Sequence, residues 1–273
     1  MISLVTYFKS FTSGEYPHFR KRMKFFPVAG VLTLILGVQC SPLQSHPAGR
    51  IGRIPVPRGY NRLVYPPGSF SDWLQKLPLK KENIIRSYTG ALIEKPFYRV
   101  MGVVDMPLLF SSDLEQCADY CFRFWAEYHR ARGRLERLVL FDYNGRALPF
   151  AGSGKSFTGF LKKAMSCANS FSIKKGADRV RPEDLMPGDM IVQNQQGGIG
   201  HVSMIMDACR NGKGQTLYLI GYSFMPAQEF HIEKASESFG MAGWFSWEGY
   251  RAYLKKHLDY GSPVLRRFPS SHQ

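Results

Sequence analysis

The stretch from Leu185 to Gln228 constrains the fold more than any other part of the sequence. It opens with a Pro-Gly-Asp turn at residues 187–189. An apolar run, a glycine-rich turn and two further apolar runs follow. Turn glycines between runs of β-favouring residues are typical of hairpins. The stretch therefore predicts three antiparallel strands, the second of which begins at His201.

The second of these strands is the most suggestive, because a histidine stands at its first position. Alternate residues of a strand point to opposite faces. One face is predicted to hold His201, Ser203, Ile205 and Asp207, and the other Val202, Met204 and Met206. An imidazole titrates near neutral pH, so His201 is a candidate catalytic base with Ser203 beside it as a binding residue. A strand-end histidine bonded to nearby backbone would explain the same position.

Length and charge set broad limits on the class of protein. The 273 residues, 44% of them hydrophobic, suffice for one large domain or two small ones. The net charge is +15, and residues 1–39 hold only five Lys/Arg and one Glu of the charged side chains. Such an excess suits an anionic surface of lipid headgroups or cell-wall polymer. No arginine-rich run or aromatic RNA-reading motif follows residue 60, so no nucleic-acid partner is expected.

The N-terminal region predicts export. Four basic residues within 20–24 precede an apolar run that stops at Cys40, as in a signal peptide. The run is too short for a comfortable membrane span. Its end resembles a bacterial lipoprotein signal, in which the cysteine is acylated, although Gln39 stands where a small residue is favoured. An uncleaved membrane anchor is the alternative, and Met23 would be a more ordinary start than Met1.

These features predict a four-part chain. Residues 1–40 form the leader, and residues 41–60, rich in Pro, Gly and Ser, a tether. Residues 61–258 form one α+β domain, and residues 259–273 a tail. We expect a protein of the bacterial envelope, periplasmic or on the outer surface. A lipid anchor would hold it to the membrane, beside peptidoglycan or another anionic polymer.

Ser111–Arg132 is the strongest predicted helix. Ser112 and Glu115 fit a capping box, and apolar residues recur every three or four positions up to Gly133. Arg123 and Glu127 lie one turn apart, where they form an ion pair or the wall of a binding cleft. The other predicted elements are a short helix capped by Ser69 or Ser71, a hairpin of Ile84–Leu92 and Tyr98–Met106, a strand and turn at 138–150, a helix over Phe157–Phe171 and an aromatic helix within Gly243–Leu258.

Four cysteines follow Cys40, and no two are spaced as Cys-x-x-Cys, so neither a zinc ribbon nor another metal site is predicted. Cys117 lies in the second turn of the predicted helix, on its apolar face. It is either a small core residue or a nucleophile activated by a histidine. Residues 152–156 (Gly-Ser-Gly-Lys-Ser) lack the upstream glycine of a phosphate loop, since Pro149 occupies that position. No cofactor is predicted.

The order of these motifs resembles that of a known enzyme group. A cysteine on a helix, then Pro-Gly-Asp, then Gly-His heading a strand, is similar to the papain-like amidases of the NlpC and CHAP type, which cleave peptidoglycan peptides. The resemblance implies a helix packed on an antiparallel sheet, here with an N-terminal αβ extension. It implies Cys117 as nucleophile and His201 as base. A polar residue of the next strand would orient the histidine, with Tyr222 and Ser223 as candidates and Gln228 just beyond.

Residues 50–250 also resemble the domain of unknown function 4846 family, bacterial and mainly Bacteroides-type exported lipoproteins. The segments that carry this likeness are Leu77-Pro-Leu-Lys, Gln116-Cys-Ala-Asp and Tyr222-Ser-Phe-Met-Pro-Ala-Gln. The family has no established activity, and Tyr222 and Trp125 stand where glutamine and arginine are expected. Two functions follow: a cysteine amidase or peptidase of the envelope, or a non-catalytic binding or scaffold lipoprotein that keeps the fold.

Overall fold

The computed structural model of the chain describes residues 49–269. The predicted leader, with both candidate start methionines and Cys40, lies outside them. Within the described part, no helix is long and apolar enough to cross a membrane.

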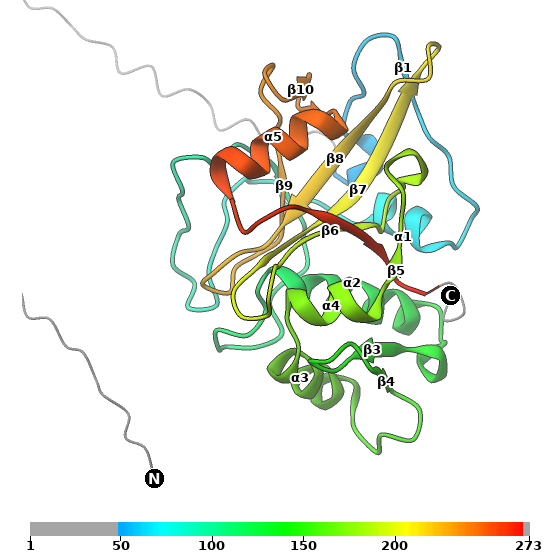
Figure 1. Cartoon of the computed structure of the whole chain (residues 1–273), viewed down its shortest axis with the longest axis vertical. Helices are drawn as coiled ribbons and strands as arrows, with labels where there is room; N and C mark the ends of the chain where they lie inside the picture. The colour runs from blue at the N-terminus through cyan, green and yellow to red at the C-terminus, as the bar shows by residue number, and fades with distance from the viewer. Residues whose placement is uncertain (1–48, 270–273) are drawn as a thin grey trace, which may run out of the picture. The chain divides into compact units, whose positions relative to one another are not determined.

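The predicted α+β class is confirmed: a large antiparallel sheet has helices on both faces (Figure 1). Its main path runs β10-β11-β8-β7-β6-β12-β5, while β1 pairs with β7 and β9 joins β8 to β2. The strands are β1 Tyr60–Arg62, β2 Val100–Val103, β5 Asp178–Arg179, β6 Met190–Gln193, β7 His201–Asn211, β8 Thr216–Tyr222, β9 His231–Glu233, β10 Gly240–Met241, β11 Trp244–Phe245 and β12 Val264–Arg267. A separate hairpin pairs β3 Val139–Phe141 with β4 Ala147–Pro149, where the sequence predicts only one strand and a turn.

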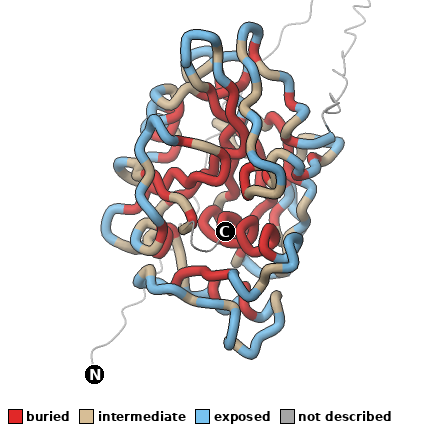
Figure 2. Tube along the Cα trace, turned by 90° about the vertical axis from the view of Figure 1, so that its right-hand side faces the viewer, coloured by how far each residue is buried: buried red, intermediate tan, exposed pale blue. Residues whose placement is uncertain are grey.

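Helices cover the sheet unequally. The α-helices are α1 Phe70–Lys76, α2 Cys117–Ala131, α3 Phe157–Cys167, α4 Ser170–Gly176 and α5 Trp247–His257, and the 3-10 turns are η1 Ile51–Arg53, η2 Leu135–Arg137 and η3 Pro182–Asp184. Helix α2 is buried at every position from Cys117 to His129. A helix buried on all sides is a core element, so α2 is the centre on which the surrounding parts pack. Figure 2 shows buried segments running through the middle of the molecule, with exposed loops outside.

The three predicted strands of the Leu185–Gln228 stretch are confirmed as β6, β7 and β8. Met190 pairs with Met204, and Met204 pairs in turn with Gly221. Val202, Met204 and Met206 belong to the core cluster that contains α2, whereas Ile205 and Tyr222 belong to the cluster under α5.

Asp207 leaves the face on which it is predicted. The β7–β8 register shifts between Ile205 and Asp207, so the alternation breaks there. The Asp207 carboxylate instead accepts hydrogen bonds from Arg62 Nε at 2.7 Å and Gln75 Nε2 at 2.6 Å.

Side-chain caps decide where the helices begin. Ser69 caps α1 by accepting from Asp72 N–H at 3.2 Å, which settles the alternative with Ser71. The predicted helix over Phe157–Phe171 is two helices, because the side chain of Asn169 caps a new start and accepts from Phe171 N–H.

Two further predictions are corrected by long-range pairing. Ile84–Leu92 and Tyr98–Met106 do not pair as a hairpin, because β2 pairs with β9 and the first run folds back on itself at Arg86 and Leu92. Residues 264–267, predicted as tail, form β12 beside β6.

The strand β12 also carries Arg267, which pairs with the buried Asp189 of the Pro-Gly-Asp turn.

The N-terminal end of the described part also departs from the prediction of a tether. Ile51, inside the predicted tether, is fully buried, and its N–H donates to the Leu77 carbonyl. The packed part of the chain therefore includes both of these terminal segments.

Candidate functional site

Helix α2 begins at Cys117, four residues later than the predicted cap would place it. Gln116 is the N-cap and forms a capping box with Asp119, while the predicted cap Ser112 lies in the turn before it. The predicted position of Cys117 in the second turn is therefore wrong. Cys117 is the first helical residue, where unbonded backbone N–H groups and the helix dipole favour a thiolate.

The Cys117 thiol lies against the start of β7. Its sulfur is 4.0 Å from the carbonyl oxygen of Gly200, the residue before His201. Burial raises the pKa of the thiol to about 11, although N–H groups of Val202, Ala118 and Cys117 itself act in the opposite direction. In this state the thiol is protonated at neutral pH. Any nucleophilic role requires a base that removes its proton.

Cys117 lines a pocket of about 360 Å³ at the N-terminal end of α2. The α3–α4 connection and the β6–β7 turn complete its walls. Its residues are Asp113, Leu114, Gln116, Cys117, Ala118, Asp119, Met165, Ser166, Ala168, Asn169, Ser170, Gly198, Ile199, Gly200 and Met225. The volume lies in the range of small-molecule sites, so a ligand of dipeptide size can reach the sulfur side of the helix.

His201 is fully buried at the first position of β7. Neither ring nitrogen has a hydrogen-bond partner among residues 49–269, so no bond to the Cys117 sulfur is formed. Burial, and secondarily the charge of His231, lowers the pKa of His201 to about 3. The imidazole is therefore neutral, and at this pKa it is a weak base for as long as it stays buried.

Aromatic rings surround His201. Tyr222, Phe224 and Tyr260 lie with ring centroids 5.0, 5.6 and 6.3 Å from the imidazole. Phe224 and Tyr260 are only partly buried. His201 has no exposed surface in this state, and Phe224 and Tyr260 are the partly exposed rings beside it.

The Tyr222 hydroxyl does not form a hydrogen bond with His201. That hydroxyl donates to Glu233 Oε2 at 3.1 Å and lies 2.5 Å from the hydroxyl of Tyr253. Glu233 also lies 3.1 Å from His231 Nε2, and it accepts from Arg99 N–H at 2.8 Å. The contact between Tyr222 and His201 is edge-to-face ring packing, so the predicted orienting bond is not formed.

The other predicted polar residues also find partners in the interior. Gln228 donates from Nε2 to Tyr98 Oη at 2.9 Å. Ser223 donates to the Gln228 carbonyl at 2.7 Å, and Ser203 accepts from Tyr250 Oη at 2.7 Å. Each is fully buried. They brace the strands around His201 and do not line the Cys117 pocket.

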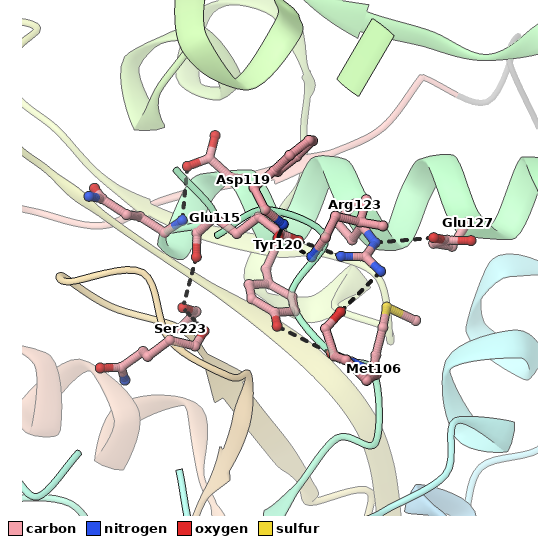
Figure 3. A network of polar contacts seen from close by, with 12 residues as sticks. Met106, Glu115, Asp119, Tyr120, Arg123, Glu127 and Ser223 are labelled. Carbon is pink, nitrogen blue, oxygen red and sulfur yellow. Dashed lines mark hydrogen bonds and ion pairs between the residues drawn. The ribbon is translucent and has the colours of Figure 1, made fainter. Parts of the chain in front are cut away.

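Arg123 and Glu127 form the predicted ion pair, at 3.1 Å, inside a larger buried network (Figure 3). Arg123 also pairs with Glu115 and donates to the Pro107 carbonyl at 3.3 Å. Glu115 in turn accepts from the N–H groups of Leu109 and Phe110. The network fixes the segment that leads into Cys117, which explains why Glu115 is unavailable for the predicted capping box.

The sequence predictions missed several polar residues of this region. Asp119 lines the pocket beside Cys117, and Tyr98, His231 and Glu233 form the buried cluster next to His201. The spacing of His231 and Glu233 on a strand was the one available signal, since residues two apart share a face. Within residues 49–269, no three His, Cys, Asp or Glu side chains are grouped to hold a metal ion.

Comparison with known proteins returns one family. The model described as Domain of unknown function (4846) matches residues 51–152 and 147–260. No curated protein and no solved structure matches.

Proposed function

The chain belongs to the domain of unknown function 4846 family, and from its site we propose that it is a papain-like cysteine amidase or peptidase. In this proposal Cys117 is the nucleophile, and His201 is the base. The single observation that carries it is the position of Cys117. It is the first residue of a buried helix, on a pocket wall, with its sulfur 4.0 Å from the residue that precedes His201.

The proposed reaction starts from a protonated Cys117 thiol and a neutral His201 ring, whose basicity returns once the site opens to water and substrate. The neutral His201 ring takes the thiol proton as the Cys117 sulfur bonds to an amide carbonyl carbon. The carbon–nitrogen bond then breaks, and the imidazolium returns the proton to the leaving amine. Water hydrolyses the thioester and restores the thiol. Backbone N–H groups at the free end of α2 are the available donors to the oxyanion.

Turnover requires the site to open. His201 has no exposed surface, and its nitrogens make no bond to the sulfur in the described state. The partly buried rings of Phe224 and Tyr260 are the covers that have to move for substrate and imidazole to meet. Once the site is open, binding of substrate would bring the thiol and the imidazole within hydrogen-bond reach of each other.

The proposed setting is the bacterial envelope. The basic n-region, short apolar run and Cys40 support an exported lipoprotein. Peptidoglycan peptides are the proposed substrate because the motif order resembles that of amidases acting on them. The positive net charge suits an anionic polymer around the protein.

A second candidate is a non-catalytic envelope module. Burial raises the pKa of Cys117 to about 11, and the Tyr222 hydroxyl serves Glu233, as expected of core residues. In that case Cys117→Ala costs roughly 1–2 kcal/mol of stability, as a small core truncation does, and no function is lost.

Purified full-length chain, incubated with peptidoglycan, separates the two candidates. New free amino groups are measured for wild type, Cys117→Ala and His201→Gln, with Cys121→Ala as the matched buried cysteine one turn further along α2. The hydrolase predicts release by wild type and Cys121→Ala only, and a thioester adduct on Cys117 by mass spectrometry. Release that persists in Cys117→Ala, or no release by wild type, would contradict it.

A further inference from the structure

The pocket beside Cys117 has an unusual charge for this chain. Its charged lining residues are two carboxylates, Asp113 and Asp119, and no Lys, Arg or His lines it. The whole chain carries a net charge of +15. A random basic surface would not produce a purely acidic pocket, so the lining is selective against anions.

The two carboxylates differ in how well they are satisfied. Asp113 Oδ1 accepts from Ala227 N–H at 2.5 Å and from Gln116 Nε2 at 3.0 Å. Asp119 is 7% exposed, and its Oδ2 accepts from Gln116 N–H at 3.0 Å. Its Oδ1 is buried and has no partner anywhere in residues 49–269. Figure 3 shows this oxygen turned away from the bond to Gln116.

A buried carboxylate oxygen without a partner is destabilising, so a donor that reaches it is favoured. A hydrogen bond from an ammonium to a carboxylate is charge-assisted and stronger than a neutral one. The positive end of the α2 dipole opposes a cation, but a helix dipole acts more weakly than a directly paired charge. The carboxylate therefore outweighs the helix dipole, and a cation is favoured.

The remaining walls define what the cation is attached to. Leu114, Met165, Ile199 and Met225 line the same pocket, and Ile199 is 72% exposed at its rim. These residues suit an aliphatic side chain. Asn169 and Ser170 also line the pocket, but their side chains are bonded to Phe171 N–H and to Asn194.

We propose that this pocket binds the primary ammonium of a peptide, with the ammonium at Asp119 Oδ1 and an aliphatic side chain against Ile199 and Met225. That the peptide is also the substrate rests on the proposed hydrolase function. Because Cys117 lines the same pocket, the ammonium belongs to a residue near the attacked carbonyl. Burial raises the pKa of Asp119, so an ammonium that binds the ionised carboxylate displaces a proton and binds more weakly as the pH is lowered.

Three probes test this on the full-length Cys117→Ala chain, in which no turnover can occur. They are leucyl-glycinamide, its N-acetyl derivative, which lacks the ammonium, and N-acetyl-leucyl-glycine, which carries a carboxylate instead. Affinities are measured by NMR titration. We expect leucyl-glycinamide to bind at least tenfold more tightly than either acetylated peptide. Equal binding, tighter binding of the carboxylate, or no detectable binding of any probe would overturn the proposal.

Asp119→Asn supplies the matched variant, because an asparagine oxygen still accepts from Gln116 N–H. It is expected to lose most of the preference, whereas Glu136→Gln, an exposed carboxylate outside the pocket, keeps it. The wild-type preference stands as a test even if Asp119→Asn folds poorly. If the chain prefers the ammonium peptide but shows no Cys117-dependent hydrolysis, the proposed ammonium site is supported and the proposed hydrolase function is rejected. If Cys117-dependent hydrolysis is observed without a preference for the ammonium peptide, the hydrolase function is supported and the ammonium site is rejected.

Discussion

The sulfur of Cys117 lies 4.0 Å from the carbonyl oxygen of Gly200, although 83 positions separate the two residues along the chain. The contact joins the first residue of the central helix to the turn that leads into β7. It places the thiol, the glycine-rich turn and the pocket in one region, and the buried His201 follows in the next position. The predictions below test the parts of this arrangement one at a time.

Native Cys117 is expected to react slowly with iodoacetamide. Burial raises the pKa of its thiol to about 11, so little thiolate exists at pH 8. The labelling rate should be on the order of a hundredfold below that of an ordinary exposed thiol and rise with pH up to about 11. Peptide mass mapping measures it, with the exposed Cys167 of the same molecule as reference. Equal rates at both cysteines would show that Cys117 is not buried in solution.

Acid should destabilise the fold through His201. Burial lowers its folded pKa from 6.5 to about 3, so the unfolded chain takes up a proton that the native chain does not between those pH values. Stability therefore falls as the pH drops below 6.5, by roughly 2 kcal/mol at pH 5 from this residue. Urea unfolding at pH 7 and pH 5 should show a smaller loss for His201→Gln than for wild type. An identical loss would refute the buried neutral ring.

Tyr222→Phe should cost stability but not activity. It removes the donor to Glu233 and the contact with the Tyr253 hydroxyl, for about 1–3 kcal/mol. Denaturant midpoints measure the cost, and Tyr143→Phe, at a ring 44% exposed, serves as the control. If Cys117-dependent hydrolysis is observed, its rate should survive in Tyr222→Phe. Complete loss of that rate in a folded variant would assign the hydroxyl to catalysis.

Arg123→Met should destabilise strongly, because it leaves Glu115 and Glu127 buried without their shared cation. Removing one partner of a buried pair costs about 3–5 kcal/mol. Arg251→Ala is the contrast, since its pair with Glu248 is solvent-exposed and is worth well under 1 kcal/mol. Chemical unfolding of both variants compares them directly. Similar costs would mean that the network of Figure 3 is open to water.

Gly200→Ala should disturb the start of β7. A Cβ atom there would overlap the Gln193 carbonyl and the Ser170 hydroxyl and lie 2.8 Å from Asn194 Nδ2. We expect a loss of about 1–3 kcal/mol, as for other overpacked sites. Thermal unfolding tests it against Gly212→Ala, where a Cβ meets nothing within 4 Å. If neither substitution lowers the unfolding temperature, the close packing around Gly200 is contradicted.

Local pattern was enough for the elements whose free energy comes from neighbours in sequence. The turn glycines between apolar runs in Leu185–Gln228 predict β6, β7 and β8, because turn chemistry acts over a few neighbouring residues. Ser69 and Ser71 likewise limit the start of α1 to two positions, since a cap bonds to N–H groups two or three residues away, and the structure selects Ser69. The candidate pair Cys117 and His201 likewise came from motif order alone.

Only the tertiary structure decided the rest. The true start of α2 depends on Glu115, whose carboxylate is held by Arg123 and by the loop N–H groups of Leu109 and Phe110. The partner of β2 lies about 130 residues away in β9, beyond any local signal. The Tyr222 hydroxyl turned to Glu233 because a buried carboxylate requires donors. Turn residues, caps and apolar runs thus determine where several strands and helices lie along the chain. Where the buried polar groups find partners depends on segments that meet only in the folded chain.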